Sequence, residues 1–184
     1  MLSRIGRLLV ISILCACRQP AQNKPASSYA DVVAGVGFNI PEAWRSVPPK
    51  SSMRAREYRV EEDGELAVFF FGSGQGGTES QNLTRWTAQF TSAGGKTSPA
   101  QTDVFKTAGL EITTAYIEGT YAADMPAMGP KKAQLGHAML GAIVKGPQGL
   151  VFFKLLGPKA TILKNRTLFE SFARGMGAGQ RTPP

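Results

Sequence analysis

The sequence predicts an α+β fold, a three-layer α-β-α sandwich around a mainly antiparallel sheet. The connections between the expected strands are short, which favours antiparallel pairing. Residues 66–71 (LAVFFF) are apolar without interruption, so the strand that contains them has to be covered on both faces. Two segments with helical periodicity, one around Trp86 and one around Phe169, can supply the two covering layers.

The first sixteen residues have the layout of a bacterial secretory signal. Residues 1–7 are basic, residues 8–14 (LLVISIL) are apolar, and small residues follow. The apolar run is too short to span a bilayer. Residues 14–17 (LCAC) resemble the lipobox of bacterial lipoproteins, in which a leucine, a variable residue and a small residue precede an acylated cysteine. The resemblance implies that residues 1–16 are a lipoprotein signal peptide and that Cys17 carries the lipid.

The two cysteines admit other interpretations. Acylation of Cys15 would place Leu14 at the cleavage position, where a small residue is expected. The spacing of Cys15 and Cys17 does not suit a structural zinc site, and the sequence holds no second pair. Cleavage and secretion without a lipid is the main rival. If Cys17 is acylated, the folded domain contains no cysteine, which excludes thiol catalysis and cysteine-based metal sites.

The remaining chain is expected to form one domain, because 184 residues with 42% hydrophobic and 18% charged content suffice for one core. Residues 17–35 are polar and contain proline, so we expect the lipidated N-terminus and a flexible tether there. The domain is expected over residues 36–177, followed by a disordered tail at residues 178–184. The net charge is +8, but the basic residues are scattered, which favours a solvated surface over a nucleic-acid site.

Alternating or uninterrupted apolar residues predict strands throughout this domain. Asp63 and Gly64 form a hairpin signal, so the strands on either side of them should pair antiparallel. A tight turn at residues 146–149 (GPQG) predicts a second hairpin. The expected strands cover residues 36–40, 53–60, 65–71, 102–106, 110–121, 137–145 and 150–156.

Two helices are expected between and after these strands. Ser80 or Asn82 can cap the first helix, in which Leu83, Trp86 and Phe90 form one apolar stripe. A proline opens the second helix directly after the last strand. The residues of this helix, from Pro158 onwards, that should supply its buried side are Leu168, Phe169, Phe172 and Met176.

Four segments carry a resemblance to a known fold: residues 38–44 (FNIPEAW), 85–90 (RWTAQF), 118–121 (EGTY) and 152–158 (FFKLLGP). Together with the order of elements, they resemble a group of bacterial secreted proteins without assigned function. That group is similar to the PsbP-like fold of the extrinsic PsbP protein of photosystem II and of the Ran-binding Mog protein. The resemblance implies the fold and a preference for protein binding, and it carries no functional residues to this sequence.

Residues 72–77 (GSGQGG) form a GxGxxG motif between a strand and a helix. In a dinucleotide-binding fold, this backbone would approach a pyrophosphate. Here the strand is expected in antiparallel hairpins, and the expected helix cap lies several residues past the last glycine. Both observations favour a flexible turn. We therefore expect no cofactor, with anion binding at the turn as an open alternative.

The sequence contains one histidine, His137, and no GxSxG motif to supply the nucleophile of a hydrolytic triad. A strand-end imidazole with a local hydrogen bond is the favoured interpretation. Glu118 lies in an apolar strand, so we expect it to be partly buried with a raised pKa. Its expected partner is Arg54, Arg56 or Lys154 on a neighbouring strand. These residues predict neither a catalytic nor a metal site.

Residues 122–135 predict a long loop that holds apolar side chains in a polar connection. Long loops are often functional, and methionines suit adaptable contacts. A mobile surface loop would have the same composition. The candidate partner-binding residues of this loop are Met125, Pro126, Met128 and Pro130.

These features predict a non-enzymatic lipoprotein of the bacterial cell envelope, anchored to a membrane through Cys17, that binds another envelope protein or a polymer. The alternative is a small-ligand receptor or hydrolase with a pocket near Glu118 and His137. Convergence of these two side chains in one pocket would favour the alternative. An apolar patch near Met125 and Met128 would favour partner binding. Nucleic acid is not an expected partner.

Overall fold

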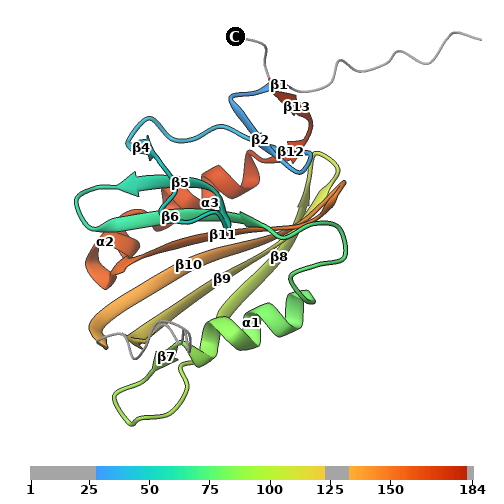
Figure 1. Ribbon diagram of the computed structural model, residues 1–184. Coiled ribbons are helices and arrows are strands. Elements are labelled where there is room, and N and C mark those ends of the chain that lie inside the picture. The colour runs from blue at the N-terminus through green and yellow to red at the C-terminus, as the bar shows by residue number, and fades with distance from the viewer. Residues whose placement is uncertain (1–27, 123–132, 182–184) are drawn as a thin grey trace, which may run out of the picture.

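The computed structural model describes residues 28–122 and 133–181 of the chain (Figure 1). The largest element in this part is an eight-stranded sheet formed by β4 to β11. Two smaller sheets of short strands lie at one end of it. The strands are β1 (Ser28–Tyr29), β2 (Asp31–Val33), β3 (Val36–Phe38), β4 (Trp44–Val47), β5 (Arg54–Val60), β6 (Gly64–Phe70), β7 (Phe90–Thr91), β8 (Gln101–Thr107), β9 (Leu110–Tyr121), β10 (Gln134–Gly146), β11 (Gly149–Pro158), β12 (Gly177–Ala178) and β13 (Gln180–Arg181). The helices are α1 (Glu79–Ala88), α2 (Lys159–Lys164) and α3 (Arg166–Arg174).

All neighbouring strands of the large sheet are antiparallel. Their order is β4-β5-β6-β11-β10-β9-β7, and β8 pairs with β9. Both predicted hairpins are confirmed, because Val60 is paired with Gly64 and Gly146 with Gly149. Each strand therefore presents alternate side chains to the two faces of the sheet.

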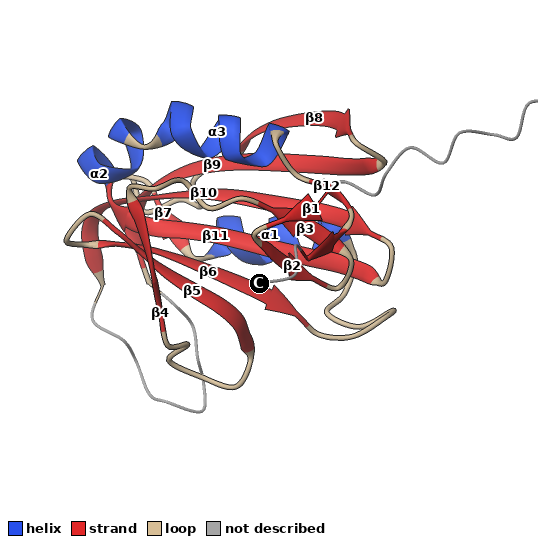
Figure 2. Ribbon diagram, turned by 90° about the horizontal axis from the view of Figure 1, so that it is seen from above, coloured by secondary structure: helices blue, strands red, loops and turns tan. Residues whose placement is uncertain are grey.

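Helices lie against both faces of this sheet. Figure 1 shows α2 and α3 above it and α1 below it, and Figure 2 gives the view from above. The strand predicted to need cover on both sides has it, since Leu66 and Val68 of β6 belong to the core under α2 and α3, while Phe69 packs against the core under α1. The smaller core, on the α1 side, consists of Trp86, Phe90, Ala115, Ile117, Met139, Ile143 and Phe152.

The larger core, on the side of α2 and α3, is built around aromatic rings. The ring centroids of Phe38 and Phe153 are 5.2 Å apart in an edge-to-face arrangement, and those of Trp44 and Phe172 are 5.3 Å apart. Such pairs stabilise a fold by about 0.5–1.5 kcal/mol beyond the burial of their area. The indole nitrogen of Trp44 donates a hydrogen bond to Asn165 Oδ1 at 3.2 Å, so the buried N–H has a partner.

Helix α1 begins before the predicted caps Ser80 and Asn82. The N-cap is Thr78, whose hydroxyl accepts a hydrogen bond from the Gln81 backbone at 3.2 Å, while Gln81 Oε1 accepts one from the Thr78 backbone at 2.8 Å. Asn82 lies buried in the first turn and donates to two backbone carbonyls. Phe90, predicted on the helical stripe, lies in β7 and still packs in the smaller core.

The predicted final helix is interrupted at Asn165, which separates α2 from α3. The buried amide of Asn165 donates to the Thr161 carbonyl at 3.0 Å and to Glu61 Oε1 at 2.7 Å, and it accepts from Trp44. These bonds offer the backbone an alternative to a continuous helix. The predicted buried residues Phe169, Phe172 and Met176 lie in the larger core, and Leu168 packs against it.

The ends of the ordered domain differ from the predicted boundaries. Strands β1 and β2 lie within residues 17–35, which we predicted as a tether, and β12 and β13 reach into the predicted tail at residues 178–184. The ring of Tyr29 is 6% exposed and lies against Gly37 and Gly177, where a larger residue would overlap it. The short strands are ordered by this long-range contact. The local sequence has no apolar periodicity that would predict them.

Candidate functional site

A groove opens between α1 and the strands β6 and β11. It has a volume of about 220 Å³. Two of its apolar side chains face solvent: Met53 is 55% exposed and Phe71 is 41% exposed. Solvent-facing apolar side chains that gather in one place mark sites of interaction. We call this site the aromatic groove; its lining residues are Met53, Phe69, Phe71, Asn82, Arg85, Trp86, Gln89, Phe152 and Lys154.

The walls of the aromatic groove are set by the sheet register. Phe152 of β11 is paired with Phe69 of β6, so both side chains point to the α1 side. The Phe69 ring stacks on Phe71 with centroids 6.1 Å apart, and Phe71 lies 5.9 Å from Phe152. The glycine motif supports this cluster, because a side chain at Gly76 (φ +85°) would come within 2.7 Å of Phe71. In this structure the motif forms a turn beside the groove, which agrees with the interpretation as a turn.

Lys154 stands in this groove, partly buried, on the same strand as Phe152. Its ammonium donates to Gln89 Oε1 at 2.9 Å and lies 5.7 Å from the centre of the Trp86 ring. Burial, together with the charges of Arg54 and Arg85, lowers the pKa of Lys154 to about 8. Within the described part of the chain, Lys154 forms no ion pair with a carboxylate.

Arg85 is a second cation at the rim of the aromatic groove. It is exposed, and Nη1 donates to Asn82 Oδ1 at 3.3 Å. Residues 28–122 and 133–181 supply no carboxylate ion pair for Arg85. The groove therefore combines aromatic walls with two cations that have neutral partners, an arrangement suited to an apolar group that carries a negative charge.

The third nearby cation, Arg54, is neutralised within a charge cluster on β5 and β6. Its guanidinium contacts Glu57 at 2.8 Å and Glu65 at 2.5 Å. Glu57, only 1% exposed, also accepts the backbone N–H of Lys50 at 2.8 Å. Burial raises the pKa of Glu65, but hydrogen bonds from Lys50 and Arg54 outweigh it, so the net pKa is below the usual value. This cluster is a structural network at the edge of the groove.

Glu118 and His137 do not share a pocket. In the register of β9 and β10, Glu118 is paired with Ala138, and His137 with Gly119, so the two side chains point to opposite faces. The Nδ1 atom of His137 lies 3.1 Å from the Leu135 carbonyl, which confirms the predicted local hydrogen bond. The geometry gives no support to a catalytic pairing of Glu118 and His137.

Two predictions for Glu118 are wrong. Its partners are the Tyr116 hydroxyl and the Lys159 ammonium, the latter at 2.9 Å, and Arg54, Arg56 and Lys154 are not among them. The hydrogen bonds from Tyr116 and Lys159 lower the pKa of Glu118, which we expected to be raised. Burial does not raise the pKa above its usual value, because the side chain is 44% exposed at the end of β9.

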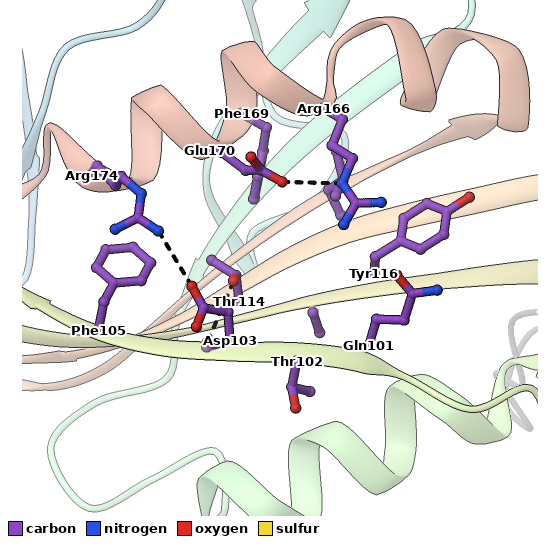
Figure 3. A pocket seen from close by; sticks show the side chains of 12 residues that line it. Gln101, Thr102, Asp103, Phe105, Thr114, Tyr116, Arg166, Phe169, Glu170 and Arg174 are labelled. Atoms are coloured by element: carbon purple, nitrogen blue, oxygen red, sulfur yellow. Dashed lines mark hydrogen bonds and ion pairs between the residues drawn. The ribbon is translucent and has the colours of Figure 1, made fainter.

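A second hollow of about 260 Å³ lies between α3 and the strands β8 and β9 (Figure 3). Arg166 lies 5.0 Å from the centre of the Tyr116 ring. The arginines in this hollow have carboxylate partners: Arg166 Nε lies 3.1 Å from Glu170, and Arg174 lies 3.3 Å from Asp103. Because its charges are already paired, this hollow is the weaker candidate for recognising a charged ligand.

Several predicted site residues lie outside the described residues. These are Cys17 and the loop residues Met125, Pro126, Met128 and Pro130. Within the described residues, no group of three or more histidine, cysteine, aspartate or glutamate side chains is placed to hold a metal ion. The helices described there are too short or too polar to cross a bilayer.

Sequence reasoning missed the aromatic groove. A signal was present, because Lys154 interrupts the otherwise apolar run of β11 (VFFKLL). A lysine in such a strand either snorkels to solvent or meets a specific partner. The choice depends on the strand order, which places Lys154 beside Trp86 and Gln89 of a distant helix segment.

The mainly antiparallel sheet with its few helices has a PsbP-like fold, as a structural match shows. The solution structure of cyanobacterial PsbP (CyanoP) from Synechocystis sp. PCC 6803 matches with a TM-score of 0.53 and 16% sequence identity. The match covers 80% of this chain and 89% of that chain. No protein-family model and no curated protein sequence matches the chain. The likeness to CyanoP shows the fold alone.

Proposed function

We propose that this protein is a non-enzymatic, lipid-anchored module of the bacterial cell envelope that binds another envelope protein through the aromatic groove. The observation that carries the proposal is the solvent-open cluster of Met53 and Phe71 beside the partly buried Lys154 and the buried Trp86. Aromatic walls with a few placed polar groups are the usual composition of a binding site.

The size of the aromatic groove favours a protein over a polymer or a free small molecule. Pockets for drug-sized ligands measure roughly 300–1,000 Å³. The groove measures about 220 Å³ and is open to solvent, so it has room for a single side chain of a partner. Protein interfaces are commonly anchored by one such side chain in a pocket. An envelope polymer is the second possible partner.

Acylation of Cys17 would hold this module at a membrane, because two or more acyl chains give stable anchoring. The segment that follows Cys17 would set the distance between the lipid and the domain. The PsbP-like domain, which we propose to be a three-layer α-β-α sandwich, would act as the rigid carrier of the groove. The loop side chains Met125 and Met128 would add an adaptable second contact.

Site-specific photocrosslinking in native membranes tests the proposed function. A photoreactive phenylalanine analogue at position 71 should form one defined protein adduct. The same analogue at Val104 of β8, which is 59% exposed and outside the groove, is the matched control. An adduct at position 71 that Trp86→Ala abolishes supports the proposal. Identical adducts from positions 71 and 104, or none from position 71, would count against it.

A further inference from the structure

We propose that the aromatic groove recognises the C-terminal residue of its partner protein, with an apolar side chain between the aromatic rings and the terminal carboxylate paired with Lys154. This inference rests on the proposed function and names the chemistry that the same site would read.

The first argument is the unmet charge of Lys154. An ammonium group has three N–H donors. In the described residues, one of them is used by Gln89 Oε1, and the Trp86 ring offers its face at 5.7 Å. A carboxylate would stabilise a partly buried cation more than its neutral acceptor does, because a hydrogen bond between two charged groups is stronger than one to a neutral group. The Lys154 ammonium is therefore suited to pairing with an anion.

The second argument is the position of the charges around the groove. Arg85 on α1 faces the groove from the helix side, and within the described residues its side-chain hydrogen bond goes to the neutral amide of Asn82. Arg54 faces it from β5 and lies 6.0 Å from the Phe69 ring, but its charge is compensated by two glutamates. Lys154 and Arg85 thus leave the groove with a net positive character that a carboxylate complements.

The third argument is geometric and separates a chain terminus from an internal acidic residue. A terminal residue carries its apolar side chain and its carboxylate on one Cα atom. It can meet the aromatic rings and Lys154 at once within a groove of about 220 Å³. An internal aspartate or glutamate would need a second residue to supply the apolar group. Capture of a C-terminal carboxylate is an established mode of peptide recognition.

The test compares peptides that differ only at the terminus. Acetylated tripeptides ending in phenylalanine, leucine or tryptophan are prepared as free acids and as amides, and their dissociation constants are measured by titration calorimetry with the full-length protein in detergent. We expect at least one free acid to bind roughly tenfold more tightly than its amide at pH 7. Lys154→Met should bring the acid to the affinity of the amide. Lys96→Met, which alters an exposed lysine outside the groove, should change neither.

The results separate this inference from the proposed function. Equal binding of acid and amide by the wild type, with both lost in Trp86→Ala, would leave the groove as a binding site and overturn the carboxylate reading. The carboxylate inference would also be overturned if Lys154→Met weakened the binding of the free acid and of the amide equally. That result would show that the lysine stem acts through packing. If no tripeptide binds, the carboxylate inference is overturned, and the photocrosslink at position 71 still decides the proposed function.

Discussion

The indole ring of Trp86 lies directly against the backbone of Gly141, so that a methyl group at position 141 would overlap it. Gly141 is in the middle of β10, paired with Lys154 of β11 and with Ala115 of β9. The absence of a side chain there lets α1 approach the sheet closely. It also fixes the wall of the aromatic groove beside Lys154.

Gly141→Ala should destabilise the fold by about 1–3 kcal/mol, because the added methyl group forces Trp86 out of its packed position. Urea unfolding followed by tryptophan fluorescence measures the change. Gly94→Ala is the control, since nothing lies within 4 Å of a side chain there, and it should change stability by less than about 0.5 kcal/mol. Equal effects of the two substitutions would refute the proposed packing of Trp86.

Lys154 should make stability rise with pH in the alkaline range. Its pKa is about 8 in the folded protein, against the ordinary lysine value of 10.5, so the unfolded chain binds more protons between these pH values. The cost of the buried charge is fully present below pH 8 and is relieved as the pH rises to 10.5. Arg54 and Arg85 are the charged groups that act on Lys154.

Lys154→Met should therefore stabilise the protein by about 1–3 kcal/mol at pH 7 and by less at pH 10. Urea unfolding at both pH values measures this difference. Direct titration of the Lys154 ammonium by NMR should give a midpoint near pH 8. A midpoint above pH 10 would show that the charge is well solvated, and the pH dependence of stability would then be absent.

Glu57→Gln should cost about 2–4 kcal/mol, because it removes the negative charge that a 1% exposed carboxylate presents to Arg54 and Lys50. Glu118→Gln should cost less than about 1 kcal/mol, because the pair of Glu118 with Lys159 is exposed. Thermal or urea unfolding of the two variants compares a buried with an exposed ion pair on one sheet. A larger effect at position 118 would contradict the burial that we describe.

Tyr29→Ala should destabilise the protein by about 3–5 kcal/mol, since the ring fills the space beside Gly37 and Gly177. It should also speed proteolytic cleavage before β3, because β1 would lose its buried apolar side chain. Tyr29→Phe keeps the ring and is the control, with more protection than Tyr29→Ala. Unchanged cleavage in Tyr29→Ala would mean that the short strands are held by their backbone pairing alone.

Cys17→Ala should move the protein from the membrane fraction to the soluble fraction if Cys17 is the acylated residue. Cys15→Ala should leave it in the membrane fraction, because the acceptor of the lipid is retained. Fractionation with immunodetection, together with the mass of the mature N-terminal peptide, measures both. If Cys15→Ala releases the protein from the membrane fraction and Cys17→Ala does not, the lipid is on Cys15.

The regular strands could be predicted from the sequence. The strand at residues 110–121 has the predicted bounds, and Asp63 and Gly64 mark a hairpin that the structure contains. These features depend on local patterns of apolar residues and turn chemistry. The start of α1 could have been predicted too, because Thr78 and Gln81 have the spacing of a capping box.

The features that could not be predicted depend on contacts between distant segments. Asn165 breaks the final helix because it meets Trp44 and Glu61, which lie more than one hundred residues earlier in the chain. The aromatic groove forms because β11 lies between β6 and β10 and brings Lys154 under α1. A single sequence gives the residue types at these positions, but the order of strands decides which of them meet.

The parallel pairing of β1 with β13 places Ser28 next to Gln180. The first and last described strands are therefore neighbours in space, although the chain between them passes through the whole sheet. A circular permutant should accordingly fold. In this permutant, a short glycine-rich linker would join the segments beyond these two strands. The new termini would lie in the turn at residues 93–95, where two glycines have open space around them. If the N-terminus carries a lipid, such a permutant would move the point of attachment to the turn at residues 93–95. It would then test whether binding at the groove depends on where the domain is attached.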